Sequence, residues 1–108
     1  MDQEEERRIF DRFLVRFPTK FKDARGEYGT DVFLRDASAS GANIVSKNRM
    51  FFNDRVDLEV ELPDRSGPLT LSGRVMWSKP NSSMWHIGLQ FDEVNFMKMH
   101  RLFKLSQA

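Results

Sequence analysis

The chain has 108 residues, which is the size of one domain with a single modest core. Seventeen basic residues nearly balance sixteen acidic ones, so the net charge of +1 gives no general attraction to a polyanion, and any anion site must come from local clustering. The absence of cysteine excludes disulfide frameworks, thiolate metal sites and cysteine nucleophiles, and it is consistent with a reducing cytoplasm, where we expect the protein to act. No apolar run approaches the roughly 18 residues that a membrane span needs, so we expect no membrane insertion.

Residues 1–12 are nearly all charged and include Arg7, Arg8 and Arg12. We predict a flexible arginine-bearing arm over 1–12, because this stretch is polar and has no apolar anchor before Phe10. Residues 13–108 then form a single domain, since no linker or internal repeat divides them.

Six segments of the domain alternate apolar and polar residues with the period of two that is typical of half-buried strands. They are 13–22, 28–35, 42–46, 56–62, 69–77 and 85–91. Pro18 cannot donate a hydrogen bond within a sheet, so we expect an edge position or a bulge there.

After residue 91 the period changes, and Phe96, Met99 and Phe103 follow the spacing of an amphipathic helix that Asp92 or Asn95 would cap. Six short strands and one helix hide their edges best by closing into a small barrel, although a two-sheet sandwich also fits the pattern. We therefore predict an all-β fold: a six-stranded antiparallel β-barrel with a C-terminal α-helix.

Two short motifs could form a binding site. Asp36-x-Ser38-x-x-Gly41 lies between the second and third strands, where a purely structural turn would use Asp36 and Ser38 to bond backbone amides and Gly41 to adopt a positive φ. Arg8 and Arg12 form an RxxxR spacing just before the first strand. By itself this spacing is also consistent with a solvated charged arm, since Arg12 and Arg16 repeat it.

Together, in this order and on this scaffold, the two motifs resemble the PilZ domain family. The resemblance continues in the segments 73–77 (GRVMW) and 88–91 (GLQF), so it covers nearly the whole chain. It implies a non-catalytic receptor that binds cyclic di-GMP on the outer surface of the barrel, with Arg8 and Arg12 folded over the nucleotide against Asp36, Ser38 and Gly41.

The chemistry of these residue types agrees with that implication. The planar fork of arginine bonds guanine O6 and N7 together, or a phosphate, and it stacks on a purine face. Asp36 can accept from guanine N–H groups, Ser38 can reach a base edge or a phosphate, and Gly41 lets the backbone approach closely.

Two further residues each allow two interpretations. Arg7 would contact a second, stacked nucleotide, or it would pair with a neighbouring glutamate. Trp77 shares the parity of Val75 and Leu71, which indicates a core residue, but it would also stack on a guanine from the end of its strand.

The main alternative is a degenerate PilZ-like module that binds a protein and no nucleotide. An OB-like barrel for single-stranded DNA or RNA is disfavoured by the near-neutral charge. An enzyme or a metal site is disfavoured because His86 and His100 lie far apart without a clear carboxylate partner, so we expect no cofactor.

The aromatic loop 48–55 either contacts a partner or lies under the barrel mouth. For a receptor, the mechanism we predict is ordering of the arm by the nucleotide, which would signal to a downstream protein partner.

Overall fold

The computed structural model describes residues 9–22, 28–29 and 32–107 of the chain. In chain order its elements are β1 (Phe13–Leu14), β2 (Thr19–Lys22), β3 (Tyr28–Gly29), β4 (Val32–Ser38), β5 (Gly41–Ser46), β6 (Arg55–Val60), β7 (Leu69–Asn81), β8 (Met84–Phe91) and α2 (Phe96–Ser106). All the described strands belong to one antiparallel sheet in the order β1-β4-β5-β8-β7-β6-β2-β3.

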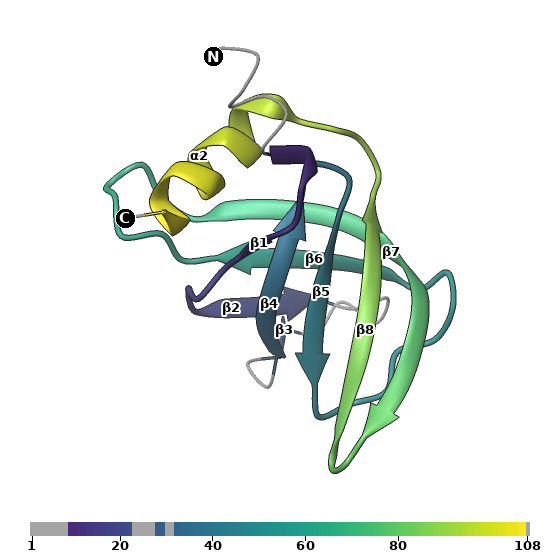
Figure 1. Cartoon of the computed structure of the whole chain (residues 1–108). Helices are drawn as coiled ribbons and strands as arrows, with labels where there is room; N and C mark the ends of the chain where they lie inside the picture. Colours follow the sequence, from purple (N-terminus) through teal and green to yellow (C-terminus); the bar gives the residue numbers. More distant parts are fainter. Residues whose placement is uncertain (1–8, 23–27, 30–31, 108) are drawn as a thin grey trace.

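This sheet curls into a half-barrel, because the long strand β7 bends (Figure 1). One end of β7 lies with β6, and its other end extends beside β8 in the half that also holds β4 and β5. The predicted antiparallel barrel-like fold with a terminal helix is confirmed, and the continuous sheet excludes a sandwich of two separate sheets. The six strands of four or more residues correspond to the six predicted ones, and the two-residue strands β1 and β3 lie within the predicted segments 13–22 and 28–35. The prediction that Asp36 and Ser38 lie in a turn is wrong, because β4 continues through both residues to pair with β5, and only residues 39–40 connect the two strands.

The segment predicted as the first strand is in fact two strands at opposite ends of the sheet order. β1 pairs with β4, whereas β2 pairs with β6 and β3. The chain between them contains Pro18, which cannot donate to a neighbouring strand but whose carbonyl accepts from the Glu61 amide at 2.9 Å. Pro18 therefore lies in the connection between two strands, and not at the edge position or bulge within one strand that we expected.

The core lies inside the curl and is closed at one end by α2. The alternate residues Val56, Leu58 and Val60 of β6 are fully buried, as the period of two predicts. The helix contributes Met99, Leu102 and Phe103 to this core. Asn95 caps the helix, since its side-chain oxygen accepts from the Lys98 amide at 3.0 Å. Asp92, the other predicted cap, instead pairs with Arg55 at 2.8 Å.

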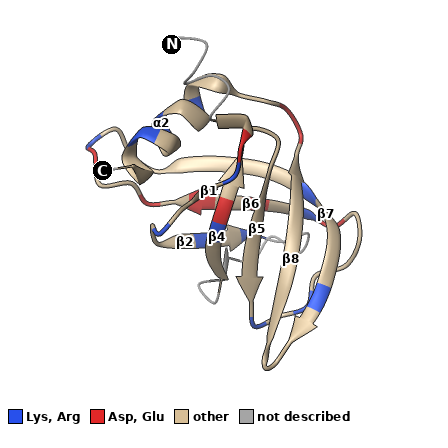
Figure 2. Ribbon diagram, in the orientation of Figure 1, with Lys and Arg blue, Asp and Glu red and all other residues tan. Residues whose placement is uncertain are grey.

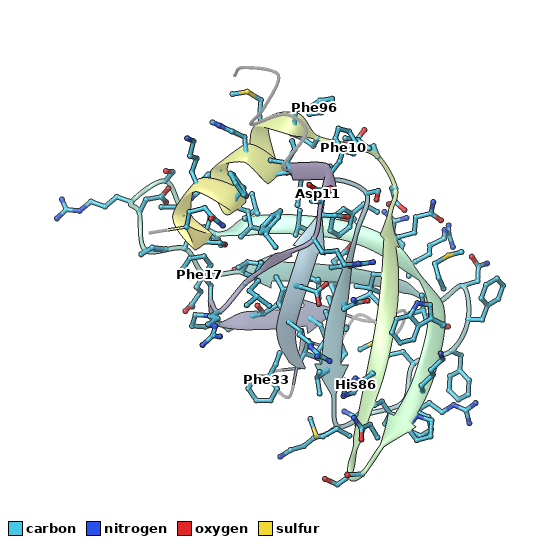
Figure 3. The ribbon with its side chains drawn as sticks, in the orientation of Figure 1. Phe10, Asp11, Phe17, Phe33, His86 and Phe96 are labelled. Carbon is cyan, nitrogen blue, oxygen red and sulfur yellow. The ribbon has the colours of Figure 1, made fainter. Side chains whose placement is uncertain are left out.

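The end of the predicted arm is packed against the domain. Ile9 is fully buried, and its carbonyl accepts a hydrogen bond from the Ala39 amide in the β4–β5 turn. Phe10, in which we expected the first anchor, is half-exposed and meets Phe96 of α2 edge-to-face at 5.6 Å between ring centroids (Figure 3). Ile9 is thus the deeper anchor. The remainder of the predicted arm, 1–8, lies outside the described residues.

Candidate functional site

Two β-bulges determine which side chains reach the outer face of the sheet. One bulge shifts the β4–β5 register between Leu34 and Asp36, and the other shifts the β7–β8 register between Val75 and Trp77. Leu34 and Val75 point into the core. In a regular strand Asp36 and Trp77, two positions after Leu34 and Val75, would also point into the core. The extra residue of each bulge turns them to the outer face instead.

The two outward-turned side chains lie in one row across the sheet. Asp36 of β4 is paired with Asn43 of β5, Asn43 with Gly88 of β8, and Gly88 with Trp77 of β7. Directly paired residues of an antiparallel sheet share a face, so these four residues line a strip of the outer surface. With strands about 4.8 Å apart, the strip is about 14 Å long from Asp36 to Trp77.

At one end of this strip, Asp36 gathers two donors. Arg12, which precedes β1, donates from its Nη1 to Asp36 Oδ1 at 2.9 Å, and the side-chain amide of Asn43 donates to the same oxygen at 3.0 Å. The Asp36 side chain is 15% exposed and that of Arg12 is 56% exposed. Because Arg12 is mostly solvated, it can leave Asp36 at little cost, whereas the less exposed Asn43 contact holds the carboxylate in place.

At the other end, Trp77 covers Gly88. A Cβ placed on Gly88 would overlap the indole Nε1 and Cε2 atoms of Trp77 and would lie 2.8 Å from Cζ2. The indole is 41% exposed, and the Lys79 ammonium lies 5.5 Å from its ring centroid. The interpretation of Trp77 as a core residue is therefore wrong, because the bulge overrides the parity that it shares with Val75. Its exposed ring is available to stack on a ligand.

The remaining motif residues form the end of the β4–β5 hairpin. Ser38 ends β4, is buried, and has its Oγ 3.3 Å from Ser40 Oγ. Gly41 begins β5 and does not have the positive φ that we predicted. Glycine is required there for another reason: a Cβ would overlap the backbone carbonyl oxygen of Leu89 in β8. This close approach brings the hairpin against β8.

The structure also adds residues that the motifs did not include. Asn43 and Gly88 complete the strip, and the exposed Arg74 and Gln90 lie opposite each other one row further along the same face. Figure 2 shows the acidic segment of β4 and the basic segments of β7 that flank this surface. An asparagine within a predicted strand is uncommon enough to have marked Asn43 as a candidate.

Of the predicted site residues, the structure brings Arg12 and Asp36 into contact, places Ser38 and Gly41 at the adjoining hairpin, and places Trp77 at the far end of the strip. Arg7 and Arg8 lie outside the described residues. No group of three histidine, aspartate or glutamate side chains suited to a metal ion occurs in the part of the chain that the structure describes.

A family model, the PilZ domain, matches residues 6–106. The chain belongs to the PilZ domain family. PilZ domains are receptors for cyclic di-GMP and catalyse no reaction. The match includes both motifs and all the described elements.

Two solved structures have a similar fold. The Bacillus subtilis inhibitor of motility (MotI/DgrA) aligns over 89% of this chain with 15% identity and a TM-score of 0.63. MrkH of K. pneumonia aligns over 88% with 17% identity and a TM-score of 0.61. At these identities the likeness concerns the fold alone. This PilZ chain spans about half the length of each, 47% and 46% respectively. No curated protein matches the sequence.

Proposed function

We propose that this PilZ domain binds cyclic di-GMP along the outer strip between Arg12 and Trp77. The observation that supports this most strongly is the shared row of Asp36 and Trp77, which two separate bulges turn onto one face. One end of the strip offers an arginine fork and a carboxylate, and the other end offers an exposed indole. A ligand with guanine edges, purine faces and phosphates uses all three groups.

Each residue has a distinct role in this proposal. Arg12 leaves Asp36 to bond a guanine edge or a phosphate, while Asp36 accepts from guanine N–H donors and Asn43 keeps its carboxylate oriented. Trp77 stacks on a purine face. Gly88 keeps the floor between Asn43 and Trp77 free of side chains, and Gly41 sets the hairpin against β8.

Arg8 and Arg7 complete the proposal from the sequence. Arg8 is four residues before Arg12 and would supply the second guanidinium of the RxxxR motif. Arg7 would contact a second, stacked nucleotide. The packing of Ile9 beside the β4–β5 turn supports this arrangement, because it anchors the chain that leads to both arginines next to the motif hairpin.

The magnitudes are consistent with a useful affinity. A bidentate arginine–guanine contact contributes about 1–3 kcal/mol of discrimination, and stacking of a base on an aromatic ring contributes about 1–3 kcal/mol. Two arginine contacts and one stack sum to about 3–9 kcal/mol, and the upper end of this range reaches the ~8 kcal/mol of micromolar binding before the ordering cost is subtracted.

Isothermal titration calorimetry of cyclic di-GMP, with GTP as a control ligand, tests this proposal. We expect micromolar or tighter binding by the wild-type protein and none with GTP. Arg12→Ala and Trp77→Ala should each weaken binding by about tenfold or more. Arg16→Ala is the matched control, since Arg16 is exposed on the polar side of the chain after β1 and should not affect affinity. A stoichiometry of two nucleotides that Arg7→Ala reduces to one would support the role of Arg7.

A folded sample that gives no binding heat with cyclic di-GMP, and no binding by a second method, would refute the receptor assignment. The degenerate interaction-module alternative would then take its place. Equal affinities of Arg12→Ala and wild type would instead show that the nucleotide binds elsewhere.

We further propose that the nucleotide orders residues 1–8 across the strip and so creates a surface for a downstream protein partner in the cytoplasm. Because Ile9 is anchored without ligand, the change should be confined to the residues before it. Hydrogen exchange that slows in residues 1–8 on nucleotide addition, with little change at 9–12, is the expected result. Equal exchange rates with and without nucleotide would contradict this mechanism.

A further inference from the structure

The outer face of the sheet continues past the proposed nucleotide strip into a second row of paired residues. Phe33 of β4 is paired with Val45 of β5, Val45 with His86 of β8, and His86 with Lys79 of β7. The last three each lie two positions from a member of the strip, along stretches of regular pairing, so this row faces the same way about 7 Å further on. Phe33 and His86 both lie at the end of the sheet away from α2 (Figure 3). The strip therefore has a neighbouring row on its outer face.

Lys79 is the only lysine or arginine of this second row. Its side chain is exposed, and its ammonium lies 5.5 Å from the centroid of the Trp77 ring. It has no ion pair with a carboxylate among the residues that the structure describes. Its backbone is fixed, because it is paired with His86 and precedes Pro80, which restricts it to an extended conformation. The flexible four-carbon stem nevertheless allows the ammonium to change partner.

The other basic side chains at this end of the strip are bound differently. His86 is partly buried, and its Nε2 lies 3.2 Å from Asn81 Nδ2. Arg74, on the opposite flank of the strip, donates from its Nη1 to the Asn53 carbonyl at 3.3 Å. Of these three side chains, Lys79 is the one that the described structure holds by an aromatic ring alone. It is therefore the cation that a ligand can recruit most readily.

Each end of the strip is covered by an exposed cation of the chain itself. Arg12 lies on the Asp36 carboxylate at one end, and Lys79 lies over the Trp77 ring at the other. Both contacts are solvated and weak, so a ligand can replace either of them. A purine that stacks on Trp77 competes for the ring that attracts Lys79, and the phosphate attached to its ribose arrives at the same end of the strip. The displaced ammonium then meets an anion.

We propose that Lys79 is a further binding residue of the strip, which leaves the Trp77 ring and pairs with a phosphate of the nucleotide stacked there. The inference rests on the proposed binding of cyclic di-GMP, and it adds a residue that neither sequence motif contains. Charge supports it, because cyclic di-GMP carries two negative phosphodiesters, whereas Arg12 and the Asp36 carboxylate together add no net charge. Lys79 supplies a positive charge at the other end. The strip should therefore favour a nucleotide over an uncharged nucleoside.

Calorimetry of cyclic di-GMP with the full chain tests this inference through Lys79→Met, Lys79→Arg and Lys20→Met. Methionine keeps a long side chain without the charge, and arginine restores the charge. Lys20 is the matched control, since it is an exposed strand lysine on β2, which pairs with none of the strip's four strands. At about 50 mM NaCl we expect roughly fivefold weaker binding by Lys79→Met, and binding within about twofold of wild type by the other two variants. At about 500 mM NaCl the Lys79→Met deficit should fall below about twofold, because salt screens exposed charges.

The inference is wrong if Lys79→Met binds at low salt as tightly as the wild type, or more tightly, since the lysine would then merely cover the ring. It is also wrong if Lys79→Arg binds as weakly as Lys79→Met, or if the deficit persists at the higher salt concentration, because the loss would then come from packing. Thermal melts check that every variant is folded.

The failure of this inference can be told apart from the failure of the receptor assignment. In the first case the wild type still binds cyclic di-GMP, and Arg12→Ala still weakens binding, while Lys79→Met has no effect. A folded wild type that does not bind the nucleotide would overturn both.

Discussion

Gly41 provides a sharp test of how the motif hairpin is built. Replacing it with alanine places a Cβ inside the contact distance of the Leu89 carbonyl oxygen, which belongs to a paired strand and has no flexible side chain to move. Ordinary contact requires at least 3.4 Å, so the two strands must separate locally by roughly 1 Å. The neighbouring hydrogen bond from the Phe91 amide to the Ser40 carbonyl, 2.9 Å long, would be stretched by the same movement.

The expected loss of stability follows from three terms. Overpacking costs about 1–3 kcal/mol, and a weakened backbone hydrogen bond costs about 1 kcal/mol. Alanine offsets about 0.4–1 kcal/mol of this by restricting the unfolded chain. The Gly41→Ala variant should therefore be less stable by about 1–3 kcal/mol, which corresponds to a melting temperature lower by roughly 5–20 °C.

Urea denaturation followed by tryptophan fluorescence measures this difference, with Ser83→Ala in the exposed β7–β8 turn as a control that should change stability by less than about 0.5 kcal/mol. Gly41→Asn separates the two explanations for the glycine. Asparagine tolerates a positive φ better than alanine, but its Cβ meets the same carbonyl. We expect Gly41→Asn to be at least as unstable as Gly41→Ala. The steric explanation would be refuted if Gly41→Asn were more stable than Gly41→Ala. It would also be refuted if Gly41→Ala were as stable as the wild type.

Three other predictions test the strip and the helix. Asn43→Ala should weaken cyclic di-GMP binding by roughly fivefold in calorimetry, because it removes a hydrogen bond of about 1 kcal/mol to the Asp36 carboxylate. Gly88→Ala should displace the Trp77 ring, alter tryptophan emission and weaken nucleotide binding as Trp77→Ala does, whereas an unchanged emission spectrum would contradict the observed packing. A hydrogen bond from Arg101 lowers the pKa of Asp64 from 3.8 to about 2, so this contact stabilises the fold fully above about pH 4 and is lost as the pH falls through 2. The stability difference between wild type and Arg101→Ala in urea should accordingly shrink from pH 4 to pH 2, and a constant difference would argue against the pair.

Much of the fold could be predicted because its strands alternate cleanly and its helix has a clear stripe. Val56, Leu58 and Val60 show the period of two, and all three are fully buried. The break between β1 and β2 was harder to predict, since alternation continues through 13–22 while the pairing partner changes from β4 to β6. Periodicity reports which side of a strand faces the core, but it does not report which neighbour the strand pairs with.

The candidate site was only partly predictable, because its geometry depends on the bulges. Asp36 and Gly41 are visible as a motif, but nothing in the residues around Leu34 or Val75 indicates that the chain gains one unpaired residue there. A single inserted residue reverses the face of every later side chain in the strand. Trp77 was therefore assigned to the core by parity, and the alignment of Asn43 with Gly88 became apparent only from the register.

If the proposed site is correct, the contact between Arg12 and Asp36 bears on how much ordering the nucleotide must cause. An ion pair with Arg12 this exposed contributes at most about 1 kcal/mol, so a guanine contact of about 1–3 kcal/mol can replace it with a net gain. Arg12 is already held beside the strip by the packing of Ile9, and little conformational entropy is lost when it changes partner. The entropic cost of binding should then fall on the residues before Ile9, where Arg8 lies. Affinity for the nucleotide would depend on both Arg8 and Arg12. Only the residues before Ile9, which include Arg8, would change conformation on binding and so present a new surface to a partner protein.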